Sequence, residues 1–116
     1  MIDIRLNDAH VRPGHSISGS ATWHTDQSPD RVSARVGWIT EGRGDRDEEY
    51  FSEASLDVGE SEFGTPSDFD FTLPIPADAP SSYDGKILRV IWVVEVRLYL
   101  SWAKDVKNTA RFRVDA

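Results

Sequence analysis

Hydrophobic and polar side chains alternate along most of this chain, and the longest alternating segment lies between Pro80 and Trp102. In steps of two, one side of residues 87–100 is entirely apolar, whereas the other side mixes Ile, Val and Tyr with Arg and Glu. Successive side chains of a β-strand point to opposite faces, so this pattern predicts one long strand with a buried face. Charged residues interrupt the segment well short of the ~20 apolar residues that a membrane-spanning helix needs. We therefore expect no membrane span.

Six further segments show the same period of two and are separated by Gly, Pro, Asp and Ser, which favour turns. They cover residues 2–6, 16–24, 31–38, 49–57, 68–73 and 106–114. No segment of useful length has a helical period. The sequence therefore predicts an all-β, seven-stranded antiparallel β-sandwich of the immunoglobulin-like kind, forming a single domain over residues 1–116.

The alternation also sorts the charged residues by face, if the third, sixth and seventh strands form one sheet and the other four form its partner. The outer face of the first sheet is then basic and carries Arg31, Arg35, Arg89, Arg97, Lys107, Arg111 and Arg113, opposed by Glu41 and Glu95. The outer face of the second sheet is acidic, with Arg5 opposing Asp3, Glu49, Glu53, Asp57, Asp68 and Asp70. The basic face also holds four outward-facing apolar or aromatic residues, namely Ile39, Ile91, Val93 and Tyr99.

An apolar patch bordered by arginines is typical of a surface that binds a protein partner. We expect a non-enzymatic interaction module whose contact residues are Arg35, Ile39, Arg89, Ile91, Val93, Arg97 and Arg111. Guanidinium groups bind carboxylates and phosphates through paired hydrogen bonds, so the expected partner is an acidic or phosphorylated protein segment. The same face could instead bind the acidic face of a second copy, which would give head-to-tail self-association. Ordinary cross-strand ion pairs around Glu95 are an equally weighted interpretation of these charges.

The composition narrows the remaining classes of function. The 116 residues are 39% apolar and 28% charged, as expected of a folded domain, and contain no cysteine for disulfides or thiolate metal sites. The three histidines are scattered, so we expect no metal and no cofactor. A net charge of -7 argues against nucleic-acid binding. The first ten residues have no basic start followed by an apolar core, so we expect a cytoplasmic protein.

Several short motifs occur in an order that resembles the N-terminal domain of arrestin-like proteins. They are Pro13 to Gly19, Leu73-Pro74, Pro80-Ser81-Ser82-Tyr83, Gly85-Lys86 and the long strand from Trp92 to Leu98. The resemblance implies an arrestin-type β-sandwich that acts as an adaptor. This chain holds one sandwich where eukaryotic arrestins have two, so activation by a receptor tail does not carry over. Gly85 permits a tight turn, at which we expect Tyr83 to fold back onto the core.

Other residues and motifs in the sequence support alternative functions. A carbohydrate- or small-ligand-binding sandwich would use exposed aromatic residues, for which the candidates are Phe51, Tyr99 and Trp102. Abundant Asp and Glu leave a carboxylate-pair enzyme as a third alternative, but no nucleophile motif is present and we expect no catalytic residue. The tripeptide Arg43-Gly44-Asp45 resembles integrin-binding loops, although we interpret it as an exposed hairpin turn.

Overall fold

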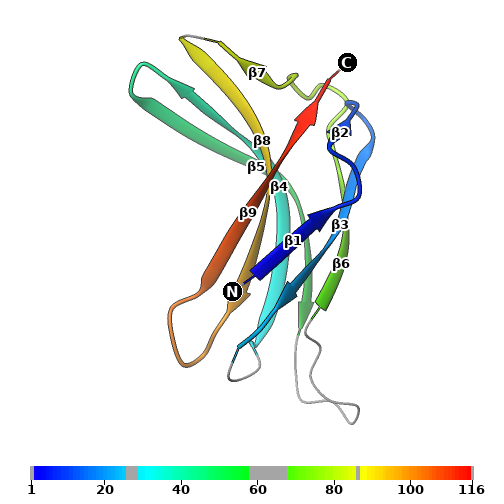
Figure 1. The fold of residues 1–116 in the computed structure, drawn as a ribbon, viewed down its shortest axis with the longest axis vertical. Helices are drawn as coiled ribbons and strands as arrows, with labels where there is room; N and C mark the ends of the chain where they lie inside the picture. The colour runs from blue at the N-terminus through cyan, green and yellow to red at the C-terminus, as the bar shows by residue number, and fades with distance from the viewer. Residues whose placement is uncertain (1, 26–28, 58–67, 86, 116) are drawn as a thin grey trace.

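The computed structural model describes residues 2–25, 29–57, 68–85 and 87–115, which form an all-β structure (Figure 1). Its nine strands are β1 (Ile2–Leu6), β2 (His10–Val11), β3 (Ser16–Trp23), β4 (Arg31–Gly42), β5 (Asp45–Asp57), β6 (Asp68–Pro74), β7 (Tyr83–Asp84), β8 (Leu88–Tyr99) and β9 (Val106–Val114). The structure contains all seven predicted strands, plus β2 and β7, which are too short to show an alternating pattern. Lys86 of the arrestin-like motif lies outside the described residues. Within the described residues, no helix is long and apolar enough to cross a membrane.

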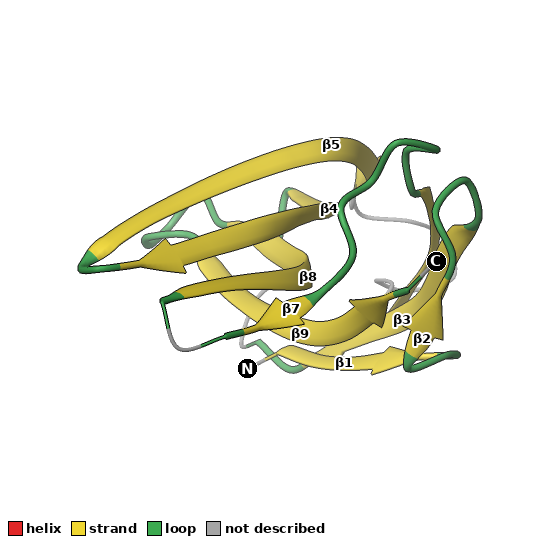
Figure 2. Cartoon of the chain, turned by 90° about the horizontal axis from the view of Figure 1, so that it is seen from above, coloured by secondary structure: helices red, strands yellow, loops and turns green. Residues whose placement is uncertain are grey.

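The strands form two sheets that pack face to face (Figure 2). The small sheet has the order β1-β3-β6, and the large sheet has the order β2-β9-β8-β4-β5, with β7 paired to β8. Alternate residues of both sheets bury the apolar core, as the two-residue period predicts. Trp92 lies at the centre with no exposed surface, and its indole Nε1 donates to the carbonyl of Pro80 at 2.8 Å. The buried indole N–H therefore has the partner that a core tryptophan needs.

Two parts of the predicted topology are wrong. The β2–β9 pair is parallel, so the sheets are not purely antiparallel. The strand β5 belongs to the large sheet beside β4, not to the small sheet. The cause is the turn at Arg43 and Gly44, where φ is 46° and 87°, because two positive φ values in a two-residue loop join adjacent antiparallel strands. The Arg43-Gly44-Asp45 motif is thus a hairpin tip, as expected.

The position of β5 changes the predicted charge distribution. Glu53 and Asp57 lie opposite Arg35 and Arg31 in the β4–β5 register, on the face that was predicted to be basic. Glu49 lies opposite Trp38, whose ring packs against the core. The outer face of the large sheet therefore mixes both signs of charge, and the predicted separation into a basic and an acidic face is wrong. Of the acidic residues predicted to share one face, Asp3, Asp68 and Asp70 do lie together, on the outer face of the small sheet.

A β-bulge at Phe51, the extra residue of β5 at the step between Val36 and Gly37 of β4, reverses the direction of side chains in the first half of β5. The plain alternation predicts that Tyr50 faces the core and Phe51 faces water. The structure shows the opposite, because Gly37 pairs with Tyr50 and Phe51 packs on the Trp38 ring at a centroid distance of 4.4 Å. A Cβ atom at position 37 would overlap the carbonyl oxygen of Glu49, so the bulge requires glycine there.

The large sheet extends beyond the small sheet at one end. The strands β4, β5 and β8 contain 12, 13 and 12 residues, whereas β1, β3 and β6 contain 5, 8 and 7. Figure 1 shows the tip of the β4–β5 hairpin and the start of β8 diverging from the three strands of the small sheet. Among the strands that the structure describes, none therefore faces this part of the inner side of the large sheet.

Replacing Gly37 with alanine tests the bulge. We expect Gly37→Ala to lower the free energy of unfolding by about 1–3 kcal/mol, because the added methyl group forces the β5 backbone away. Gly44→Asn serves as the matched control, since position 44 has open space and asparagine tolerates a positive φ. Urea unfolding of both variants measures the difference. Equal midpoints for the two variants would contradict this account of the bulge.

Candidate functional site

The outer face of the large sheet carries all seven residues that the sequence analysis selected for partner binding. They come from β4, β8 and β9, and the register places Arg111 beside Val93, Ile91 beside Ile39, and Glu95 beside Arg35. The structure therefore brings them to one face, but it gives them three different surroundings.

The first group surrounds the carboxylate of Glu95, which is only 4% exposed. Arg35 approaches its Oε1 with both Nε and Nη2 at 3.0 Å, and Arg97 Nη2 lies 3.7 Å from the same oxygen. Tyr50 donates its hydroxyl hydrogen to Oε2 at 3.3 Å, and the Arg35 guanidinium lies 3.7 Å above the Tyr50 ring. A buried carboxylate needs such partners, because an unpaired charge in this position would cost several kcal/mol. Arg35 and Arg97 are therefore held by Glu95.

Two tyrosines on this face, Tyr50 and Tyr99, have shifted pKa values. Burial and the nearby Glu95 carboxylate raise the pKa of Tyr50, because both disfavour its phenolate. The pKa of Tyr99 is lowered, first by a hydrogen bond from Ser33 and then by Arg31, whose guanidinium lies 4.2 Å from the centre of the Tyr99 ring. The pKa values of these two tyrosines, which lie on the same face, are thus shifted in opposite directions.

The second group is apolar and is less exposed than the alternation predicts. Val93 is 1% exposed and Ile39 is 8% exposed, so the fold leaves little of either side chain open to a partner, and their contact with one stays a prediction. Val93 lies in register between Gly37 and Arg111, and Tyr50 follows on β5. Long arginine and tyrosine side chains cover short apolar neighbours with their own apolar stems. Only Ile91 of this group keeps an intermediate exposure.

The third group comprises Arg89 and Arg111. Arg89 makes ion pairs with Asp84 at 3.0 Å and with Glu41 at 3.5 Å. Among the described residues, no carboxylate lies within ion-pair distance of Arg111. Of the four predicted arginines, Arg111 is therefore the one whose charge the described residues leave unpaired.

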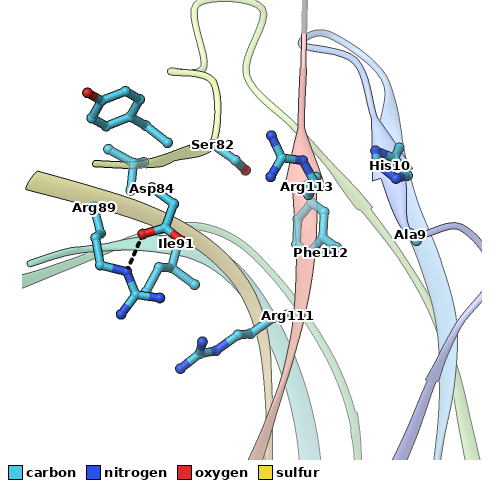
Figure 3. A pocket seen from close by; sticks show the side chains of 11 residues that line it. Ala9, His10, Ser82, Asp84, Arg89, Ile91, Arg111, Phe112 and Arg113 are labelled. Atoms are coloured by element: carbon cyan, nitrogen blue, oxygen red, sulfur yellow. Dashed lines mark ion pairs between the residues drawn. The ribbon is translucent and has the colours of Figure 1, made fainter. Parts of the chain in front are cut away.

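Arg89, Ile91 and Arg111 share a pocket of about 320 Å³, which we call the basic pocket (Figure 3). It forms where β9 separates from β8, since the end of β9 pairs with β2 while β7 pairs with the start of β8. Its lining combines cationic groups with apolar and hydroxyl-bearing side chains and with one carboxylate, Asp84, which is paired with Arg89. The lining residues used below are His10, Ser82, Arg89, Ile91, Arg111, Phe112 and Arg113.

Hydrogen bonds fix the walls of the basic pocket. Ser82 donates its backbone N–H to the carbonyl of Val114 at 2.7 Å, and its Oγ accepts from the Val114 N–H at 2.9 Å. The hydroxyl hydrogen of Ser82 is thus available to an acceptor in the pocket. Arg113 and His10 both contact Asp115, at 3.3 Å and 3.4 Å, and together they lower the pKa of that carboxyl group.

Sequence reasoning missed several members of this site. The selected list omits Arg113 and His10, which the parallel β2–β9 pair brings beside Arg111. A two-residue parallel strand has no alternating pattern by which it could be recognised. Tyr50 was assigned to the core because the bulge is not visible in the sequence.

The aromatic candidates for carbohydrate binding are separated by the fold. Phe51 packs on Trp38 at the inner side of the large sheet, whereas Tyr99 lies on the outer face beside Arg31. Trp102 is 41% exposed between β8 and β9. Within the described residues, no group of three or more His, Asp or Glu side chains could hold a metal ion.

Comparisons with known proteins bear on the fold. No family model matches the chain, and no curated protein matches its sequence. Among solved structures, the sporulation control protein Spo0M from Bacillus subtilis is similar, with a TM-score of 0.66 and 19% sequence identity. Spo0M has an arrestin-like fold, so the similarity supports the arrestin-like fold that the sequence motifs imply. The match covers 99% of this chain and 49% of the Spo0M chain, so this chain spans about half the length of Spo0M.

The opposite pKa shifts predict the order in which tyrosines ionise. In an alkaline titration followed by ultraviolet absorbance, Tyr99→Phe should remove an early component and Tyr50→Phe a late one. The folded state favours the Tyr99 phenolate, which adds stability as pH rises from its lowered pKa toward the usual value of 10.0. Tyr50 has the opposite sign, so it removes stability as pH rises from 10.0 toward its raised pKa. Loss of the same component in both variants would contradict the assignment.

Proposed function

We propose that this chain is a non-enzymatic protein-binding module that takes an acidic segment of a partner at the basic pocket. The observation that carries the proposal is the position of Arg111, whose guanidinium has no ion-pair partner among the described residues and lies at the edge of a pocket that also contains Arg89 and Arg113. Arg35 and Arg97 are paired with Glu95 on the same face of the sheet, so we do not propose them as the main contacts of the partner.

The lining of the basic pocket suits a carboxylate or another anionic group. Arg111 offers a planar fork of N–H donors, and the Ser82 hydroxyl can add a further donor. Phe112 and Ile91 supply apolar surface that excludes water beside these donors, which strengthens each charge-assisted hydrogen bond. Hydrogen bonds to charged groups contribute about 1.5–3 kcal/mol each, so two or three anchors support a specific but reversible complex.

A small anionic ligand is a second candidate for the same pocket. The volume of about 320 Å³ lies within the range of ordinary small-molecule sites. Self-association remains part of the proposal as well, because Asp3, Asp68 and Asp70 share the outer face of the small sheet and could bind Arg111 of another copy. Sedimentation of the purified protein separates this case from binding to a different partner.

Affinity capture with a charge reversal tests the proposed function. We expect Arg111→Glu to lower recovery of a specific partner from native lysate by about tenfold, since it replaces an attraction by a repulsion. The effect should weaken as the salt concentration rises above the physiological level, because the Debye length then falls below about 8 Å. Arg5→Glu is the matched control, because it makes the same change of charge on the exposed outer face of the small sheet. Mass spectrometry of the captured proteins gives the readout.

Two outcomes would overturn the proposal. Equal recovery with wild type, Arg111→Glu and Arg5→Glu would remove the basic pocket from partner binding. Capture that disappears equally in both variants would show that only the net charge matters. Thermal unfolding of each variant confirms that the comparison is made between folded proteins.

A further inference from the structure

The uncovered end of the inner face of the large sheet collects exposed apolar side chains. Of the six large hydrophobic residues that are exposed among the described residues, three lie on or beside this end, namely Phe51, Tyr83 and Leu88, which are 39%, 57% and 43% exposed. Tyr83 was expected to fold back on the core, and its exposure shows that this prediction is wrong. We call this surface the overhang, formed by residues 38–42, 45–51, 83–84 and 87–92.

The floor of the overhang is aromatic and aliphatic. Trp38 contacts Phe51 at 4.4 Å and Trp92 at 5.1 Å between ring centroids, which fixes the deep end of the surface. Val90 lies in register between Thr40 and Tyr83, and the Leu88 side chain lies against Gly42. The apolar floor therefore continues from the core to the end of β8.

One wall of the overhang is acidic. Asp45, Asp47 and Glu49 lie in register with Gly42, Thr40 and Trp38, so the alternation of β5 directs all three carboxylates to the inner side. All three residues are exposed, and among the described residues none of them is within ion-pair distance of a cation. The only arginine in this part of β5 is Arg46, which pairs with Glu41 and Glu48.

We propose that the overhang binds an amphipathic helix of a protein partner, with an apolar face and a row of Lys or Arg along one side. A sheet face is normally covered by a second layer, and the helix would supply that layer where the small sheet ends. Its apolar face would cover Trp38, Phe51 and Leu88, and its basic side would meet the carboxylates of β5. The proposal concerns the inner-facing side chains of β4, β5 and β8. The basic pocket opens at the gap between β8 and β9 and shares residues 83–84 and 89–91 with the overhang, but it does not include β4 or β5.

The size of the overhang suits a short helix. Five residues of strand, such as residues 38–42, extend over about 17 Å. A helix rises 1.5 Å per residue, so about 11 residues, or three turns, cover this length. Acidic residues on an edge strand also discourage aggregation. Edge protection alone predicts no preference for a basic helix over other peptides of the same charge, and this difference can be measured.

The probe is a synthetic helix of about 14 residues, with Leu at helical spacing on one face and Lys along its flank. A peptide with the same composition, but with Leu and Lys scrambled to remove the apolar face, is the peptide control. Both are titrated into isotope-labelled protein. The chain contains four tryptophans, whose indole N–H signals report on different regions. We expect the amphipathic helix to shift the signals of Trp38 and Trp92 and to leave those of Trp23 and Trp102 in place.

Two double charge reversals separate the acidic wall from net charge. Asp47→Lys with Glu49→Lys should weaken binding of the amphipathic helix by about tenfold or more. The matched control is Asp68→Lys with Asp70→Lys on the outer face of β6, where both residues are exposed, and it should change the affinity by less than about twofold. Leu88→Ser keeps every charge and should weaken binding through lost apolar contact.

Several results would overturn the proposal. Absence of binding, equal binding of the scrambled peptide, or equal losses in the two charge reversals would each leave edge protection as the explanation of the acids. A concentration-dependent dimer in sedimentation that Leu88→Ser abolishes would assign the overhang to a second copy of this chain.

Discussion

The buried carboxylate of Glu95 is the constraint on which the outer face of the large sheet depends. It lies on the side of β8 that faces away from the core, yet it is 4% exposed. A charge in this position requires partners of opposite sign with hydrogen-bonding geometry. Arg35 supplies two N–H groups at 3.0 Å, and Tyr50 supplies its hydroxyl at 3.3 Å. These side chains thus form a fixed polar layer where the alternation of the sequence predicts a free binding surface.

This layer divides the arginines of the sheet into two kinds. Arg35 and Arg97 neutralise Glu95, so their binding capacity is used within the fold. Arg111 lies beyond the layer, where β9 leaves β8 and opens the basic pocket. The sequence does not distinguish a paired arginine from an unpaired one, but only an unpaired guanidinium has all its N–H donors available to a partner. The divergence of two strands thereby places the Arg111 guanidinium beside Phe112, in the pocket for which we propose an acidic partner segment.

Alternation was sufficient to predict seven strands and most of the core, because burial of one sheet face imposes a period of two along each strand. Alternation was insufficient wherever the direction, pairing or burial of a residue depended on a neighbouring strand. The bulge at Phe51 reverses the first half of β5, and it depends on Gly37 of the neighbouring strand β4, where a Cβ atom would clash with β5. The pairing of β4 with β5 follows from the two-residue turn at Arg43 and Gly44, which makes the two strands neighbours in one sheet. Burial of Val93 depends on side chains from β5 and β9, so no local pattern contains it.

A double-mutant cycle between Arg35 and Glu95 tests the central claim most directly. The free energy of unfolding is measured for Arg35→Met, for Glu95→Met and for the double variant. The account predicts that Arg35→Met alone is the most destabilising, because it leaves the carboxylate buried without its main partner. The double variant should recover stability, with a coupling energy of about 1.5–3 kcal/mol. Additive losses, with a coupling below about 0.5 kcal/mol, would show an ordinary surface pair and contradict the account.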